Sequence, residues 1–302
     1  MTRKLRILAF TATLGLILAG CGDSTTSDPA GEGDERATLV VGSQQYYSNE
    51  IIAELFAQSL ENAGFEVDRQ YQIGQREVYM PEVEAGTIDV FPEYSGNLLQ
   101  YLDPTSTAQS PADIAAALTA ALPDGIRALP AAGATDQDSF NVTAEFAATW
   151  NLTSIGDLAN VDEPLKIAAN SEFEIRPYGP SGLAEVYGVV VNLIPIEDGG
   201  GPLTVQALLD GTVQVADIYS ASPAIAINGL VTLDDPKNLV LPQNVTPLVS
   251  ERVDDAAIAA IAAVTEKLTT QELVELNRRS VDEQAPSADI ARTWLAEQGI
   301  VD

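Results

Sequence analysis

Side chains able to bind a ligand are concentrated where apolar, strand-like runs end. The run 88–91 stops at Pro92 and is followed by Tyr94-Ser95-Gly96-Asn97, where a helix is expected to begin. In open α/β sheets, ligands collect outside the carboxyl ends of strands, near helix N-termini. An aromatic ring beside a hydroxyl and an amide suits a small molecule with one cationic or apolar end and one polar end. The alternative is that Tyr94 is a core residue and Gly96 only a turn.

Two further strands are predicted to end in similar polar stretches. The run 38–42 leads into Ser43-Gln44, and the run 213–218 leads into Tyr219-Ser220. A Tyr-Ser pair therefore follows one strand in each half of the chain. We interpret the two pairs as the two sides of one cleft.

Acid/base and metal chemistry have few candidate residues in this chain. It has no His, and its single Cys21 lies near the N-terminus, which excludes Ser-His-Asp, Cys-His and zinc sites. Asp136 and Asp138 lack the Gly and the final Glu of a calcium loop. The sequence therefore predicts a protein that is not an enzyme and that uses no cofactor and no metal.

The N-terminus predicts export and anchoring. Three basic residues precede the apolar segment 7–18, which is short for a membrane span and typical of a signal peptide. Leu18-Ala19-Gly20-Cys21 then resembles the bacterial lipoprotein signal, in which the Cys is lipidated and becomes the new N-terminus. We expect a signal peptide at 1–20, a flexible tether at 21–37, and a protein held by lipid on the extracytoplasmic face of the cell membrane. The alternative is an ordinary buried Cys in a membrane-anchor helix.

The net charge limits the possible partners. It is −29 for the whole chain, and it becomes −32 once the three basic residues of 1–20 are removed, because that segment holds no acidic residue. Nucleic acid and anionic membrane surfaces both require basic patches, so neither is expected as a partner.

Alternating strand and helix patterns predict an α/β protein with two lobes. We expect the first lobe to comprise 38–137 and 243–302, and the second to comprise 138–242. A parallel sheet is predicted in the first lobe from the βαβ order, with three C-terminal helices covering that lobe. The predicted strands lie at 38–42, 65–71, 88–91, 126–129, 139–142, 165–169, 189–194, 213–218, 230–233 and 239–241, and the predicted helices at 50–63, 78–84, 111–122, 154–158, 203–209, 254–268, 270–279 and 287–298.

Several of these stretches resemble one family. They are Val41-Gly42-Ser43, Pro92-Glu93-Tyr94-Ser95-Gly96, Ser171-Glu172-Phe173 with Arg176, and Leu276-Asn277. In this order they resemble the substrate-binding lipoproteins of osmoprotectant ABC importers, which bind glycine betaine, choline, carnitine and related quaternary ammonium compounds. The resemblance implies a type II periplasmic-binding-protein fold with a ligand cleft between the lobes. It also implies delivery of the ligand to a permease that is driven by a separate ATPase.

The resemblance assigns four positions to an aromatic cage around the trimethylammonium group. Tyr94 falls on the first and Tyr219 on the third, whereas the second is Ser139 and the fourth is Gln243. The two replacements leave open a different ligand on the same fold, one that carries hydroxyl or amide groups. Tyr46 or Tyr47 could rebuild a missing wall.

The resemblance also assigns the polar end of the ligand. It implies that Arg176, Asn97 and Gln44 hold a carboxylate, with Arg176 forming two parallel hydrogen bonds. The alternative for Arg176 is a structural salt bridge to Glu172 or Glu174.

We therefore expect a monomeric solute-binding protein that binds a small quaternary ammonium compound or another zwitterion and passes it to ABC permease subunits. A third hypothesis is a surface lipoprotein that acts as a sensor or assembly factor and closes on no small molecule.

Overall fold

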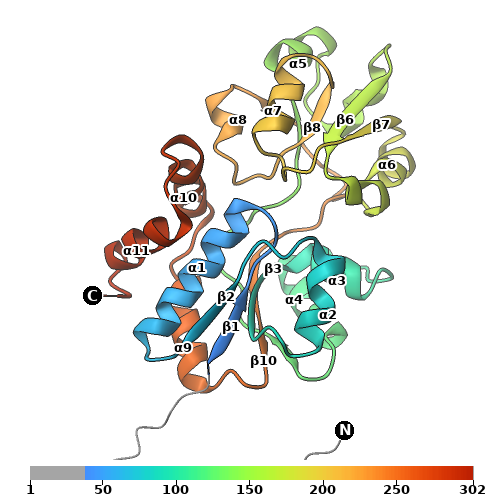
Figure 1. The fold of residues 1–302 in the computed structure, drawn as a ribbon. Coiled ribbons are helices and arrows are strands. Elements are labelled where there is room, and N and C mark those ends of the chain that lie inside the picture. Colours follow the sequence, from blue (N-terminus) through green and yellow to red (C-terminus); the bar gives the residue numbers. More distant parts are fainter. Residues whose placement is uncertain (1–37, 302) are drawn as a thin grey trace, which may run out of the picture. The chain divides into compact units, whose positions relative to one another are not determined.

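The computed structural model describes residues 38–301, in which two mixed β-sheets are each flanked by helices (Figure 1). We call the part built on the first sheet lobe 1 and the part built on the second sheet lobe 2. The predicted signal peptide, Cys21 and the tether lie outside the described residues. Among the helices that are described, none is long and apolar enough to cross a membrane.

The sheet of lobe 1 has the strand order β2-β1-β3-β10-β4. Strands β1, β2 and β3 run parallel, whereas β10 is antiparallel to both of its neighbours. The five strands are β1 (Leu39–Gly42), β2 (Val67–Gln70), β3 (Val90–Tyr94), β4 (Ile126–Ala128) and β10 (Val245–Ser250).

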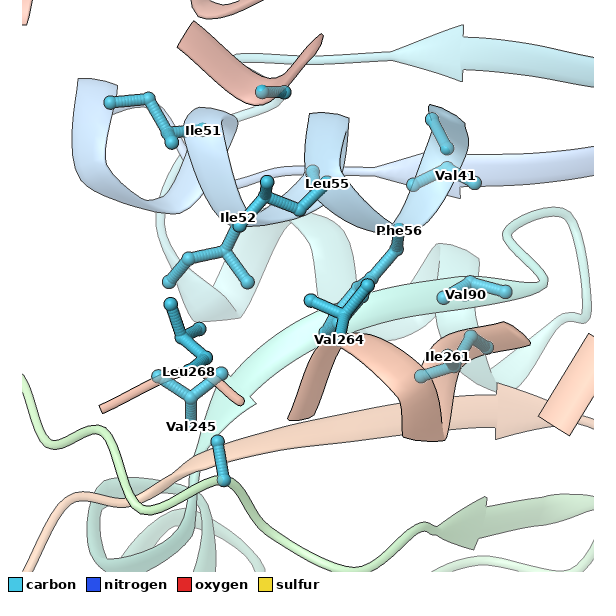
Figure 2. Close-up of a cluster of buried hydrophobic side chains, with 14 of the residues drawn as sticks. Val41, Ile51, Ile52, Leu55, Phe56, Val90, Val245, Ile261, Val264 and Leu268 are labelled. Atoms are coloured by element: carbon cyan, nitrogen blue, oxygen red, sulfur yellow. The ribbon is translucent and has the colours of Figure 1, made fainter. Parts of the chain in front are cut away.

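Helices pack on both faces of this sheet. One face carries α1 (Tyr47–Asn62), α9 (Asp255–Thr265), α10 (Thr270–Asp282) and α11 (Ser287–Glu297), and the other carries α2 (Arg76–Glu84), α3 (Ser95–Leu102) and α4 (Pro111–Ala121). The apolar residues of α1 recur at helical spacing, so one side of the helix meets both the strands and α9 (Figure 2). Asp254 and Thr269 cap α9 and α10 by accepting backbone N–H bonds.

The sheet of lobe 2 has the order β7-β6-β8-β5-β9. Its parallel centre is β6 with β7 and β8, and β5 runs antiparallel to β8 and β9. The strands are β5 (Phe140–Val142), β6 (Leu165–Ala169), β7 (Val191–Pro195), β8 (Val215–Asp217) and β9 (Val231–Thr232), and the helices are α5 (Ala144–Trp150), η1 (Ile155–Asn160), η2 (Ser171–Ile175), α6 (Pro180–Gly182), η3 (Leu183–Tyr187), α7 (Pro202–Leu209) and α8 (Ala224–Ile227).

Two segments connect the lobes and lie side by side. The first follows β4 and the second precedes β10, and an antiparallel bridge joins Thr135 of the first to Asn244 of the second. The backbone N–H of Asp136 donates to the carbonyl of Gln243 at 3.2 Å, and that of Val245 donates to Ala134 at 3.0 Å. Two lobes joined by two crossing segments form the two-lobed fold of type II periplasmic binding proteins, as expected.

Three details of the sequence prediction are wrong. Strand β3 does not stop at Pro92 but continues to Tyr94, because Pro92 lies opposite Pro247 on β10 and β1 pairs with β3 only at Val90. An antiparallel pair of prolines loses nothing where the two residues exchange no N–H bond. The lobe 1 sheet is mixed rather than parallel, because β10 runs antiparallel to its neighbours. The sequence analysis did not predict this strand. The stretch 239–241 is buried but forms no strand.

Phe56 of α1 is a sensitive test of the lobe 1 core, since it is fully buried against the strands and α9. We expect Phe56→Ala to lower the free energy of unfolding by about 3–5 kcal/mol, through lost burial and the cavity left behind. Val78 is 55% exposed, so Val78→Ala should change it by less than about 0.5 kcal/mol. Urea unfolding followed by circular dichroism measures both. Equal effects of the two variants would contradict the packing described.

Candidate functional site

One pocket collects residues from both lobes at the carboxyl ends of their strands. Gln44 follows β1, Tyr94 ends β3, and Tyr219 follows β8, and all three line it. Asn97 from the first turn of α3 and Arg176 from the segment after η2 also line it. Five of the seven predicted ligand-binding residues are therefore brought together.

Three tyrosine rings form the aromatic part of the pocket. Tyr46 stacks on Tyr94 with ring centroids 6.4 Å apart, and its ring meets the edge of Tyr219 at 5.0 Å. Burial raises the pKa of all three phenols, so they stay neutral at ordinary pH. Tyr47, the other candidate for a missing wall, lies instead in a surface groove with residues of α7 and α8. The structure thus places a third ring, Tyr46, beside the two predicted ones.

Ser139 and Gln243 do not line this pocket. The Ser139 hydroxyl donates to the carbonyl of Ile218 at 2.5 Å. The Gln243 side chain is fully buried and holds Asn97 from two sides: its Nε2 donates to Asn97 Oδ1 at 2.7 Å, and its Oε1 accepts from the Asn97 backbone N–H at 2.9 Å. Both side chains are occupied by contacts within the protein.

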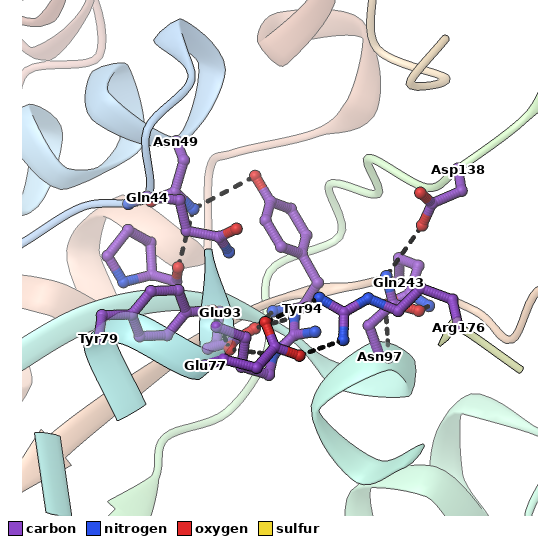
Figure 3. A network of polar contacts seen from close by, with 12 residues as sticks. Gln44, Asn49, Glu77, Tyr79, Glu93, Tyr94, Asn97, Asp138, Arg176 and Gln243 are labelled. Atoms are coloured by element: carbon purple, nitrogen blue, oxygen red, sulfur yellow. Dashed lines mark hydrogen bonds and ion pairs between the residues drawn. The ribbon is translucent and has the colours of Figure 1, made fainter. Parts of the chain in front are cut away.

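Asn97 connects the lobes. Its Nδ2 donates to Asp138 Oδ2 at 2.9 Å (Figure 3). The same Nδ2 also donates to the Tyr178 hydroxyl at 3.1 Å. The neighbouring Gly96 is more than a turn, because a Cβ there would lie 2.7 Å from both Leu241 Cβ and Pro242 O of the crossing segment. A glycine is needed for α3 to approach that segment closely.

Arg176 forms an ion pair with a residue of lobe 1 rather than with the neighbouring acids of its own segment. Its Nη1 and Nη2 donate to Glu77 Oε1 and Oε2 of α2, at 2.5 and 3.2 Å. The predicted alternative partners, Glu172 and Glu174, do not form this pair. In the structure, Arg176 fastens the two lobes together at the rim of the pocket (Figure 3).

A buried ion pair next to Tyr94 holds the backbone of that residue in place. Arg76 of α2 is 5% exposed and donates two hydrogen bonds to Glu93, at 2.7 and 2.9 Å. Glu93 also accepts from the Tyr79 hydroxyl at 2.5 Å and from the backbone N–H of Tyr94 at 2.7 Å. This network was not predicted, since nothing in the sequence indicates that Arg76 and Glu93 meet.

Four carboxyl side chains also line the pocket: Asp136, Asp138, Glu172 and Asp217. Burial raises the pKa of Asp136 to about 6, while hydrogen bonds from Ala221 N–H and the Ser48 hydroxyl oppose the shift. Burial likewise raises the pKa of Glu172 and of Asp217. The sequence analysis considered Asp136 and Asp138 only as a calcium loop. Their position between the lobes could have indicated a role in the cleft.

The part of the chain that carries this site matches a known protein family. Residues 37–297 match the family described as the substrate binding domain of the ABC-type glycine betaine transport system. The chain belongs to this family. Its members are the substrate-binding components of ABC transport systems and act outside the cytoplasm.

Individual relatives agree with the family assignment. The glycine betaine-binding protein YehZ of Escherichia coli K12 is 25% identical over 274 residues, which cover 86% of this chain and 90% of YehZ. A crystal structure of a glycine betaine/carnitine/choline ABC transporter superposes with a TM-score of 0.71 at 20% identity, over 87% of this chain and all of the other. The structure of apo YehZ gives a TM-score of 0.64 at 22% identity, over 88% and 100% of the two chains.

The site of this family member offers neutral rings and carboxyl groups but no metal cluster. Within residues 38–301, no group of three or more His, Cys, Asp or Glu side chains is arranged to hold a metal ion. The arrangement can bind a small organic cation between rings and acids.

The ion pair between Arg176 and Glu77 should favour the closed arrangement of the lobes. We expect Glu77→Gln to increase the radius of gyration of the ligand-free protein, because one carboxylate that holds the lobes together is removed. Glu84→Gln, on an exposed position of the same helix, is the matched control and should change nothing. Small-angle X-ray scattering measures both. Identical profiles for Glu77→Gln and the unmodified protein would exclude this role.

Proposed function

We propose that the pocket between the lobes binds a small quaternary ammonium compound, which the protein delivers to an ABC permease. The main support is the cluster of three neutral tyrosine rings, Tyr46, Tyr94 and Tyr219, in a pocket that also contains carboxyl groups. YehZ is named a glycine betaine-binding protein, and the solved structure named above is described as a glycine betaine/carnitine/choline ABC transporter, which agrees with such a ligand.

The chemistry of the ligand explains the need for rings. A trimethylammonium group has no N–H to donate, so it is held by π-faces, dispersion and nearby negative charge. Each ring that faces the cation contributes roughly 0.5–2 kcal/mol, more when water is excluded. Tyr46 and Tyr94 are buried and Tyr219 is partly buried, so the pocket excludes water from most of their surface.

The alternative ligand, a hydroxylated or amide-bearing solute, loses its main support. It depended on Ser139 and Gln243 facing the ligand, and both side chains are engaged elsewhere. We therefore favour the quaternary ammonium compound. The sensor hypothesis differs in that it expects no closure on any small molecule.

We propose further that the mature protein is a monomer attached to the membrane through lipidated Cys21. In this arrangement, residues 1–20 are removed, 21–37 act as a tether, and the lobes comprise 38–137 with 243–302 and 138–242. The N-terminal sequence pattern supports the anchor, and the two sheets support the division into lobes.

Binding should be measurable by calorimetric titration of the purified full chain with glycine betaine, proline betaine, carnitine and choline. We expect at least one dissociation constant below about 1 mM, which corresponds to roughly −4 kcal/mol. Tyr219→Ala should weaken that binding by about 5- to 30-fold, whereas Tyr219→Phe, which keeps the ring, should weaken it far less. If none of the four compounds binds, the proposal is wrong.

The anchor can be tested by fractionating cells that express the full chain. Cys21→Ser should move the protein from the membrane to the released fraction, because no thiol is left to carry lipid. Adding S27C, which moves the thiol six residues along the tether, should not restore anchoring. Membrane attachment that survives Cys21→Ser would contradict lipidation at this residue.

A further inference from the structure

Two arginines are the positively charged side chains among the described residues that line the pocket, and a glutamate binds each of them. Arg76 donates to Glu93 at 2.7 and 2.9 Å, and Arg176 donates to Glu77 at 2.5 and 3.2 Å. In both pairs, two nitrogens of the guanidinium meet two oxygens of one carboxylate, the geometry in which a ligand carboxylate would otherwise be bound. Neither arginine therefore offers the ligand an unpaired charge.

The two ion pairs differ in how easily they separate. Arg76 and Glu93 both belong to lobe 1 and are both buried, so the position of lobe 2 does not affect their pair. Glu77 and Arg176 lie on different lobes, and the side chain of Glu77 is 41% exposed, so water can replace either partner. Glu77 does not line the ligand pocket but an adjoining hollow, which shares Arg176 with the pocket. Arg176 is therefore the one guanidinium of the pocket that can be released, and Glu77 holds it from outside.

Neutral donors are available in the pocket where the arginines are not. The Nε2 atoms of Gln44 and Gln75 are buried and have no hydrogen-bond partner within residues 38–301, and both side chains line the pocket. Gln44 is only 5% exposed. An unpaired buried donor costs free energy, so a ligand that supplies an acceptor oxygen is favoured there. Because the amides are uncharged, they do not require a negative charge on that oxygen.

Backbone hydrogen bonds hold both glutamines in place. The N–H of Gln44 donates to Asn49 Oδ1 at 2.8 Å. Asn49 Nδ2 donates in turn to the Tyr94 hydroxyl at 3.5 Å (Figure 3). Gln75 immediately precedes α2, and its carbonyl accepts from the N–H of Val78 at 2.8 Å. One amide is thus tied to a tyrosine ring of the pocket, and the other is tied to the start of a helix.

The acidic side chains of the pocket oppose a ligand carboxylate. No ion pair within residues 38–301 includes any of the four that line the pocket, which are Asp136, Asp138, Glu172 and Asp217. A ligand carboxylate would be repelled by those that are ionised, whereas a trimethylammonium group would be attracted to them. The pocket thus favours positive charge and offers neutral donors for the other end of the ligand.

We propose that Glu77 makes the pocket prefer a quaternary ammonium alcohol to a quaternary ammonium carboxylate, because it keeps Arg176 from binding the ligand. The polar end of the ligand is then bound by the amides of Gln44 and Gln75. The inference rests on the proposed function and narrows the class of ligand for the same site.

The preference arises from competition for one guanidinium. A ligand carboxylate binds Arg176 only after Glu77 has been displaced, so the ion pair that is lost offsets the ion pair that is gained. A ligand hydroxyl needs no arginine and leaves the pair between Arg176 and Glu77 intact. The quantity to measure is therefore the ratio of the dissociation constants of two ligands that share the same cationic group.

Choline and glycine betaine are the matched probes, because they share the trimethylammonium group and differ in hydroxyl against carboxylate. Tetramethylammonium is the third probe, because it carries the cation and no oxygen. Calorimetric titration of the full chain at neutral pH measures all three. We expect choline to bind more tightly than glycine betaine by about tenfold or more, since only the carboxylate must displace Glu77.

Glu77→Gln should shift the ratio towards glycine betaine by about fivefold or more, because Arg176 is no longer held by a carboxylate. Glu84→Gln, at an exposed position of the same helix, should leave the ratio unchanged. Adding Arg176→Gln to Glu77→Gln should abolish the shift. Looser closure of the lobes would weaken both ligands alike, so the ratio separates the effect on Arg176 from any effect on opening.

Gln75→Met keeps the length of the side chain and removes its donor. It should weaken choline binding by about fivefold or more and leave tetramethylammonium binding unchanged, because tetramethylammonium has no oxygen to accept the amide N–H. Gln70→Met, at an exposed position of β2, is the control and should change neither.

Glycine betaine binding as tightly as choline to the unmodified protein, or an unchanged ratio in Glu77→Gln, would overturn the inference and leave the proposed function standing. Binding limited to carnitine or proline betaine, which both carry a carboxylate, would do the same. Equal effects of Gln75→Met on choline and tetramethylammonium would overturn the assignment of Gln75. Absence of binding by choline, glycine betaine, carnitine and proline betaine would overturn both the inference and the proposed function.

Discussion

The buried ion pair between Arg76 and Glu93 is the interaction on which the lobe 1 side of the pocket depends. Glu93 is fully buried and Arg76 almost so, and removal of one partner from such a pair typically costs about 3–5 kcal/mol, because a lone buried charge remains. The same carboxylate holds the backbone N–H of Tyr94 and the hydroxyl of Tyr79. The pair therefore fixes the end of β3 against α2, and with it the ring of Tyr94 and the two residues, Gln75 and Glu77, that flank Arg76.

Closure over the pocket depends on hydrogen bonds and one ion pair at its rim. Asn97 is held rigidly by Gln243 and presents its amide to Asp138 and Tyr178 of the other lobe. Arg176 bonds to Glu77 beside it. Polar contacts of this kind can be exchanged for water at little net cost, typically about 1 kcal/mol per hydrogen bond. The lobes can therefore separate without the large penalty that an extensive apolar interface would impose.

The sequence predicted the architecture well and the pocket partly. Strand and helix periodicity located most elements, and the two Tyr-Ser pairs pointed to Tyr94 and Tyr219, which line the same pocket. Strand β10 was missed because Pro247 lies within it, and a central strand with a proline contradicts the usual pattern. The partners of Arg76 and Arg176 could not be predicted, since local sequence does not specify which distant acid a guanidinium meets. The position of Asp136 and Asp138 in the pocket was not predicted, because nothing distinguishes them from the many other acidic residues of the chain.

The paired crossing segments limit how the two lobes can move. Because Thr135 and Asn244 bridge the two connections, twisting one lobe against the other would shear that bridge, whereas bending leaves it intact. The bridged connections therefore favour bending of one lobe toward the other over twisting. Asp136 and Gln243 lie in these connections, and Asp136 also lines the pocket, so bending of the connections and occupation of the pocket act on the same short stretch of backbone.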